Sequence, residues 1–323
     1  MAQFIRRLDR LDALERMLTN SKQGTWWRDL LTLWRPSGQA SGTDGLRVAI
    51  RNNYMNFYRR GQSVARAGFN KDKWPVLWVH AKYVLPQNER QAIGQEYVVL
   101  TSTSLVRSGG QQLPYEGVQT LREWIRTVDE EYGGDEKALV DDLLSVPEND
   151  GVIDLEMALP AWGDEKTAPR MDLVSIAPVN GQQTVFFGEV KLVTDSRLRC
   201  RVPVVRDKMP EVLKQLSIYR KYLAVPEHRT QISQQYSIAA RVLKRLRDMA
   251  DAIGPVRSLG TSILQSADEE LAVAELARLI VMNDGRVDQS VWADHRTKLE
   301  SERELVPMIE LASPGVLNFS MMQ

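Results

Sequence analysis

This chain of 323 residues has one cysteine, no long apolar run and a net charge of zero. Cys200 is the only cysteine, which excludes an internal disulfide and a metal cluster held by cysteines. No apolar run approaches the roughly 18 residues that a membrane-spanning helix needs. The first residues alternate charged and apolar side chains, unlike a secretory signal peptide. The composition therefore predicts a cytoplasmic protein that does not act at a membrane.

Several motifs of common enzyme classes are also missing. The sequence contains no GxxxxGK[ST] phosphate loop, no HExxH, no GxSxG and no GxGxxG. Its three histidines, His80, His228 and His295, are scattered and lack the spacing of a metal site. Any ATPase or helicase activity that the function requires is therefore expected from partner proteins.

The net charge is zero, but the charges are segregated along the chain. Residues 129–165 carry thirteen acidic side chains and one basic one, whereas residues 197–247 carry thirteen basic and three acidic ones. Residues 47–82 form a second basic stretch, with eight Lys or Arg and a single Asp. Basic surfaces bind nucleic-acid phosphates with little dependence on sequence. Solvated helix faces give similar runs, so the pattern alone leaves both interpretations open.

The first third of the sequence predicts a separate module, residues 1–115. Apolar residues at spacings of three and four predict a helix over 4–34, and a loop rich in Gly and Ser follows at 36–45. Residues 46–106 predict β structure, with a strong strand at 76–84.

Aromatic and basic residues interleave in this β-rich part. The combination suits single-stranded or distorted nucleic acid, because bases stack on aromatic rings and phosphates pair with cations. An ordinary sheet with an aromatic core and a basic outer face gives the same pattern, and this is the simpler interpretation. The aromatic residues are Tyr54, Phe57, Tyr58, Phe69, Trp74 and Trp78, and the basic ones are Arg47, Arg51, Arg59, Arg60, Arg66, Lys71, Lys73 and Lys82.

Residues 116–323 predict a second domain of α/β (α+β) class. Its core elements follow the order helix, three strands, helix, strand. The predicted helices are 116–131, 134–146, 208–224, 230–253 and 288–301, and the predicted strands are 151–159, 171–177, 184–193, 277–282 and 305–311.

Two of these strands carry charged residues in apolar surroundings. Asp172 begins one strand, and Glu189 and Lys191 lie on one face of the next because alternate residues share a face. A short connection brings Asp172 beside Glu189, and neighbouring carboxylates repel unless a cation lies between them. Mg²⁺, or Mn²⁺ in its place, is a hard ion that two carboxylates, water and substrate phosphate can hold.

This pattern predicts a metal-dependent nuclease site. Asp172 and Glu189 would hold the ion, and Lys191 would orient the attacking water or stabilise charge on the phosphate. The acid-x-Lys tripeptide is weak evidence by itself, since 135–137 and 164–166 contain two others in polar sequence. The alternative is a surface strand with an ion pair.

The predicted helix over 208–224 places Gln215 and Tyr219 on one face, four residues apart. These two side chains would contact a nucleic-acid backbone or order the site. Tyr219 alternatively belongs to the apolar stripe of that helix.

Together, Asp172, Glu189-Val190-Lys191 and the Gln-x-x-x-Tyr segment 215–219 resemble the PD-(D/E)XK nuclease superfamily, more narrowly its exonuclease-like branch. The resemblance covers roughly residues 134–285. It implies a restriction-endonuclease-like αβββαβ core and divalent-metal cleavage of DNA in restriction, repair or phage defence. The family's metal-binding Asp corresponds to Asp172, its catalytic Glu to Glu189 and its Lys to Lys191. The Gln and Tyr of its helix correspond to Gln215 and Tyr219. The family's Pro commonly sits just before the Asp, whereas Pro169 lies three residues earlier.

The family often has an upstream acid as well. Glu156 is our choice, because it lies on the strand before Asp172; Glu136, Asp141 and Asp142 on the preceding helix are also candidates.

Arg197, Arg199 and Arg201 follow the catalytic strand at alternate positions, which predicts one side of a strand or extended loop that carries a phosphate track. A solvated surface is the alternative for each Arg.

DNA is the expected partner, with RNA as an alternative. Two hypotheses compete with the nuclease: a non-catalytic nucleic-acid-binding protein of the same fold, and an interaction protein with a coincidental motif.

Overall fold

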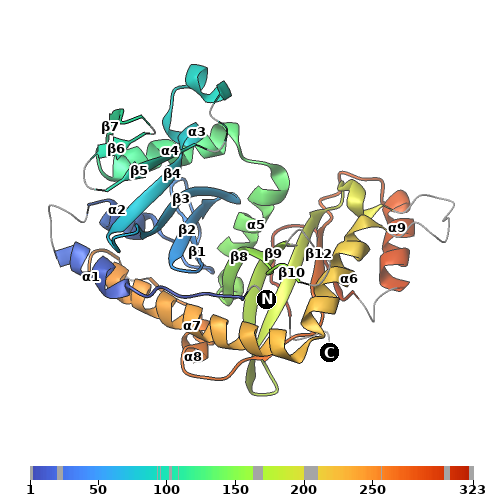
Figure 1. Cartoon of the computed structure of the whole chain (residues 1–323). Coiled ribbons are helices and arrows are strands. Elements are labelled where there is room, and N and C mark those ends of the chain that lie inside the picture. The colour runs from blue at the N-terminus through green and yellow to red at the C-terminus, as the bar shows by residue number, and fades with distance from the viewer. Residues whose placement is uncertain are drawn as a thin grey trace.

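The computed structural model shows a mixed α/β protein with two lobes, each built on its own β-sheet (Figure 1). In Figure 1 the long helix α7 (Pro226–Asp251) runs beneath both lobes. No helix in the described part of the chain is long and apolar enough to cross a lipid bilayer. The structure describes residues 3–19, 25–92, 94, 96–101, 104–107, 109–162, 170–199, 210–255, 257–301 and 306–319.

The first sheet is an antiparallel meander in which each strand pairs with the next one in sequence. Its strands lie almost entirely within the region 46–106 that the sequence predicts as β structure. They are β1 (Arg47–Ile50), β2 (Tyr54–Arg59), β3 (Gln62–Phe69), β4 (Pro75–His80), β5 (Tyr97–Leu100), β6 (Ser104–Val106) and β7 (Gln112–Pro114).

One face of this sheet is apolar and packs against helices. Met55 and Phe57 of β2 and Leu77 of β4 are buried on this face, as alternation along half-buried strands requires. The ring of Trp27 in α2 (Thr25–Leu33) meets Phe57 edge-on, with 6.4 Å between ring centroids. Helix α4 (Val118–Glu131) contacts β2 and β3, although it follows the boundary that the sequence predicts at residue 115.

The predicted helix over 4–34 is wrong at its beginning. Helix α1 covers only Leu11–Thr19, and the preceding residues run beside the β1–β2 turn. The Arg7 N–H donates to the Arg51 carbonyl at 3.2 Å, and the Asn53 N–H donates to the Arg7 carbonyl at 2.8 Å. This backbone bonds to the sheet rather than within a helix, which explains the error.

The predicted strand over 76–84 is also too long. Strand β4 ends at His80, whose ring nitrogen accepts a hydrogen bond from the Lys82 N–H at 3.2 Å. The short helices α3 (Ala81–Val84) and η1 (Gln87–Ala92) then interrupt the β region. A side chain that caps a helix start competes with the extended conformation at this point.

The second sheet has the strand order β13-β12-β10-β9-β8, with the short β11 beside β10. Strands β8 to β10 are antiparallel, whereas β12 is parallel to β10 and β13 is parallel to β12. The bounds are β8 (Val152–Ala158), β9 (Arg170–Val179), β10 (Gln182–Leu192), β11 (Ala272–Val273), β12 (Arg278–Met282) and β13 (Met308–Leu311).

Helices lie on both faces of the second sheet. Leu139 and Leu143 of α5 pack with Leu173 and Val190 in one apolar cluster, whereas α6 and α7 pack against the other face. The predicted order helix, three strands, helix, strand is present as α5, β8–β10, α6 and β12, with α7, α8 and β11 inserted before β12. The helix bounds are α5 (Asp135–Ser145), α6 (Glu211–Leu223), α8 (Thr261–Ser266) and α9 (Gln289–Ser301).

Buried ion pairs join the two lobes. Asp154 of β8 is only 2% exposed and accepts hydrogen bonds from Arg51 at 2.6 Å, Arg6 at 2.9 Å and the Tyr236 hydroxyl at 3.0 Å. Burial opposes the charge on Asp154, but Arg51 and Arg6 outweigh it and hold the pKa of this carboxyl below its ordinary value. Asp141 of α5 bonds in the same way to Arg47, at 2.8 Å.

We expect Asp154→Asn to lower the free energy of unfolding by about 3 kcal/mol, because two buried guanidinium groups lose their counter-charge. Denaturant titration at neutral pH measures this change. The exposed pair of Asp12 with Arg16 supplies the control, since Asp12→Asn should change little. Equal stability of the two variants would show that the buried pairs do not hold the lobes together.

Candidate active site

The charged residues of the second sheet meet at one end of β9 and β10. Gly188 pairs with Leu173, so Glu189 and Asp172 occupy the next positions along these antiparallel strands. The Lys191 ammonium lies 2.6 Å from a Glu189 carboxylate oxygen and 3.5 Å from an Asp172 oxygen. The three side chains that the sequence places on one face therefore converge on a single point.

Backbone groups fix this arrangement. The Val190 N–H donates to the Asp172 carboxylate at 2.7 Å, and the Lys191 ammonium donates to the Val190 carbonyl at 2.7 Å. A carboxylate that accepts a backbone N–H has a restricted direction. Two carboxylates and one carbonyl oxygen thus surround the ammonium of Lys191, whose side chain is 1% exposed.

Helix α5 contributes a third carboxylate. Glu136, in its first turn, lies 3.4 Å from the Lys191 ammonium and 3.2 Å from the Arg197 guanidinium. Arg197 also pairs with Asp195, at 2.5 Å. Glu136 is one of the candidates for the upstream acid, and it contacts the Lys191 cluster directly.

Glu156, our choice for the upstream acid, lies at the edge of the same site. It has a φ of +48°, unusual for a strand residue, and its closest ion pair is with Arg170 at 3.8 Å. Its assignment stays a prediction. Asp141 and Asp142 lie farther along α5, and Arg47 already engages Asp141.

Helix α6 places Gln215 and Tyr219 behind Glu189. The Tyr219 hydroxyl lies 3.1 Å from a Glu189 oxygen and also contacts the Arg170 carbonyl, while the Gln215 amide donates to that hydroxyl at 2.6 Å. Tyr219 is fully buried, so it cannot touch a phosphate in this arrangement. The Gln215 amide thus reaches Glu189 through the Tyr219 hydroxyl, and Tyr219 is at the same time part of the apolar core.

Burial and mutual repulsion perturb the ionisation of this cluster. Burial, followed by the neighbouring Asp172 charge, raises the pKa of Glu189 to about 7. Burial also raises the pKa of Glu136. Burial opposes the charge on Lys191, but Asp172 and Glu189 outweigh it, so its pKa is raised and the ammonium stays charged at neutral pH.

The cluster opens into a pocket of about 260 Å³. Asp172, Glu189, Lys191 and Gln215 line it on the second-lobe side, and Tyr58 faces them from the first lobe. The pocket is therefore bounded by both lobes, which the Asp154 network holds together.

The donor chemistry fits a hard divalent cation. The oxygens of Asp172 and Glu189 and the Val190 carbonyl already surround one positive charge, that of Lys191. Oxygen donors of this kind suit Mg²⁺ or Mn²⁺. No set of three or more Asp, Glu, His or Cys side chains among the described residues is arranged to hold a metal, so carbonyl oxygen and water would complete the shell.

The predicted arginine track takes a different form. Residues Ser196–Leu198 form the 3₁₀ turn η3 instead of a strand or extended loop, because the Asp195 carboxylate caps the Arg197 N–H at 2.8 Å. Arg197 is held by Asp195 and Glu136, and Arg199 is exposed. Arg201 lies outside the described residues.

Sequence reasoning missed two contributors. Asp195 pairs with Arg197, which also pairs with Glu136. The acid-x-Arg spacing of 195–197 is the local sequence signal for this capped turn. The Val190 carbonyl has no sequence signal, because every residue supplies one.

A scan against protein-family models and searches of curated proteins and of solved structures found no match to this chain.

The Glu189 pKa has a consequence for stability. Because its pKa in the folded protein lies above the ordinary value of 4.5, Glu189 stabilises the fold at acidic pH. This contribution is lost as the pH rises from about 4.5 to about 7. In the Glu189→Gln variant the side chain does not ionise, so this loss of stability with rising pH is absent. The free energy of unfolding of the variant relative to wild type should therefore increase over this interval, by on the order of 2 kcal/mol.

Denaturant titrations in EDTA at pH 5, 6, 7 and 8 measure that difference. Glu211→Gln, an exposed change on α6, is the control and should show no such trend. A constant or decreasing difference between Glu189→Gln and wild type would contradict the raised pKa.

Proposed function

We propose that the protein is a divalent-metal-dependent nuclease that hydrolyses phosphodiester bonds, with DNA as the expected substrate and RNA as the alternative. In this proposal the second lobe is a PD-(D/E)XK-like core, as the resemblance implies. The observation that carries it is the convergence of Asp172, Glu189 and Lys191 on one point at the floor of a pocket.

The carboxylates give the site its chemistry. Asp172 and Glu189, with the Val190 carbonyl, would hold Mg²⁺ or Mn²⁺. When bound, the ion polarises the phosphate and makes an attacking water more acidic. Asp172 is fixed for this role by the Val190 N–H, and Glu189 by the Tyr219 hydroxyl.

Lys191 acts as a fixed positive charge. Its pKa is raised, so it does not serve as a neutral base at physiological pH. An ammonium at the floor of a half-closed pocket stabilises negative charge that develops on phosphate oxygens. Of the two roles that the sequence predicts for Lys191, we propose this one, and a charged ammonium is also able to orient the water.

A non-catalytic nucleic-acid-binding protein is the second candidate. One observation favours it: Lys191 already forms ion pairs with three carboxylates and neutralises part of their charge. In that case the cluster is a structural ion-pair network and needs no metal. Cleavage in Mg²⁺ against EDTA separates the two candidates.

We expect Asp172→Ala, Glu189→Ala and Lys191→Ala each to lower Mg²⁺-dependent cleavage of labelled DNA by at least about a hundredfold, as for loss of a group that acts on the transition state. Initial rates on single-stranded and duplex substrates measure the effect. Glu211→Ala and Lys214→Ala, exposed on α6, are matched controls and should keep full activity. Undiminished cleavage in the first three variants would rule out the assignment.

Tyr219→Phe tests the positioning of Glu189. The change removes the hydroxyl but keeps the buried ring, so we expect an intact fold and about tenfold slower cleavage. Because the hydroxyl acts through Glu189, the concentration of Mn²⁺ that gives half-maximal rate should also rise. A slower rate with an unchanged Mn²⁺ dependence would argue for a purely structural role.

A further inference from the structure

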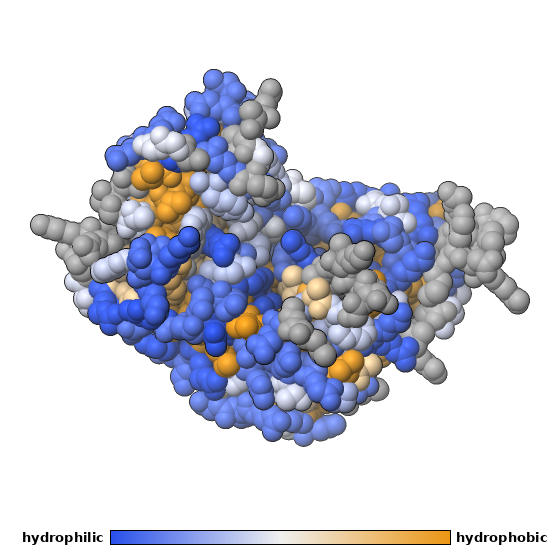
Figure 2. All heavy atoms as spheres, in the orientation of Figure 1, coloured by the Kyte–Doolittle hydropathy of each residue, from blue (hydrophilic) through white to orange (hydrophobic). Residues whose placement is uncertain are grey.

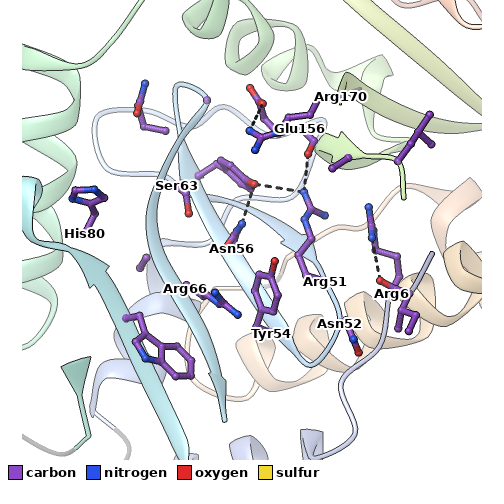
Figure 3. Close-up of a pocket in the computed structure, with 18 of the residues that line it drawn as sticks. Arg6, Arg51, Asn52, Tyr54, Asn56, Ser63, Arg66, His80, Glu156 and Arg170 are labelled. Carbon is purple, nitrogen blue, oxygen red and sulfur yellow. Dashed lines mark hydrogen bonds and ion pairs between the residues drawn. The ribbon is translucent and has the colours of Figure 1, made fainter. Parts of the chain in front are cut away.

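A larger pocket adjoins the candidate active site. It has a volume of about 610 Å³, and Figure 3 shows that strands of the first sheet form its wall. Tyr58, Gly61, Lys137, Glu156 and Arg170 line both pockets, so the two are parts of one groove. The face of the molecule in Figure 2 is mainly hydrophilic, with one apolar patch on the first lobe and smaller apolar spots elsewhere.

Three side chains on adjacent strands form the far part of this groove. Arg66 of β3 pairs with Trp78 of β4 across the sheet, and Tyr54 lies on the neighbouring β2. The Arg66 guanidinium carbon is 3.6 Å from the Tyr54 ring centroid and 5.5 Å from that of Trp78. In Figure 3, Tyr54 and Arg66 project into the pocket from neighbouring strands. This is the face of the sheet opposite to Phe57 and α2.

The charge of the groove is positive. Arg6 and Arg51 line it but are bound to Asp154. Arg66 and Lys137 are different, because neither forms an ion pair within 4 Å in the part of the chain that the structure describes.

Lys137 lies where the two pockets join, and a glycine allows it to do so. A Cβ at Gly61 would come within 2.8 Å of the Lys137 side chain, and Gly61 has a φ of +65° in the β2–β3 turn. Glycine is favoured at this position because it has no Cβ to collide with Lys137 and because it adopts a positive φ without strain. The turn thus keeps a cation between the carboxylate cluster and the aromatic part of the groove.

We propose that this groove binds a single strand of nucleic acid, with bases on Tyr54, Arg66 and Trp78 and backbone phosphates near Lys137 and Arg170. Stacking on protein rings requires a base whose face is free, and in a duplex these faces are covered by neighbouring bases. The inference rests on the proposed function, since it takes the substrate of the carboxylate site to be nucleic acid. It adds that the strand next to the bond that is cut is unpaired.

Binding without cleavage tests this inference. The probes are a fluorescein-labelled DNA strand of about 20 nucleotides, long enough to exceed the site sizes of single-strand binders, the same strand in a duplex, and an RNA strand of equal sequence, each titrated in EDTA. The wild-type chain should bind a single strand more tightly than the duplex. Trp78→Ala and Arg66→Gln should each weaken single-strand binding by about tenfold, whereas Trp78→Phe should restore most of it.

Two matched variants control for nonspecific effects. Trp74→Ala removes a tryptophan that is 68% exposed and outside the groove, and Arg126→Gln removes an exposed arginine on α4, the helix that packs on the opposite face. Both should bind as wild type. If Trp78→Ala lowers the thermal midpoint, Arg66→Gln, at an exposed side chain, carries the test.

The outcomes separate this inference from the nuclease proposal. Loss of single-strand binding in the groove variants, with binding retained in Trp74→Ala and Arg126→Gln, supports the groove even where no cleavage is found. Stronger binding of RNA than of DNA supports it and identifies the strand. Unchanged binding in the groove variants, or an equal loss on the duplex, overturns it while leaving metal-dependent cleavage untouched.

Discussion

The candidate site is organised around the ion pairs that the Lys191 ammonium forms with its neighbouring carboxylates. This ammonium lies among the carboxylates of Asp172, Glu189 and Glu136, which would otherwise repel one another; Glu189 is buried, whereas Asp172 and Glu136 are partly exposed. A cluster of this kind is expensive to bury and is stable only when its charges are paired. The burial that raises the pKa of Glu189 is also what allows electrostatic interactions in the pocket to be strong.

The position of the site depends on the joint between the lobes. The first lobe supplies Tyr58 to the active-site pocket and a sheet face to the adjoining groove. Asp154 joins the two lobes through its ion pairs with Arg6 and Arg51, and it lies two residues before Glu156 in the sequence. The same strand β8 therefore carries a structural carboxylate on its buried side and a groove-lining carboxylate beside the pocket. The proposed substrate binding on the first lobe and the proposed chemistry on the second both depend on this connection.

Much of the second lobe could be predicted because its signals are local. Alternation along β10 put Glu189 and Lys191 on one face, and the apolar strand around them implied that charge at these positions needed a partner. The helical spacing of Gln215 and Tyr219 likewise gave their shared face. Asp195 and the 3₁₀ turn were missed because a side-chain cap overrode the alternating pattern at Arg197 and Arg199.

Contacts between distant segments could not be predicted. The Arg6 and Arg51 pairs with Asp154 join residues that lie 148 and 103 positions apart. Aromatic residues of the first sheet posed a similar difficulty, because Phe57 in the core and Tyr54 on the open groove occupy equivalent sequence patterns. Only the placement of α2 and α4 decides which face is covered. Sequence patterns therefore could not choose between the ordinary sheet and the nucleic-acid surface.

The oxygens around Lys191 are proposed to form a divalent-cation site, and the nuclease function depends on this. A crystal structure of the protein soaked in Mn²⁺, with data collected at the manganese absorption edge, tests it most directly. We expect an anomalous peak in contact with Asp172, Glu189 and the Val190 carbonyl, lost in crystals of Asp172→Asn. Absence of the peak, with Lys191 still bonded to all three carboxylates, would contradict the metal site.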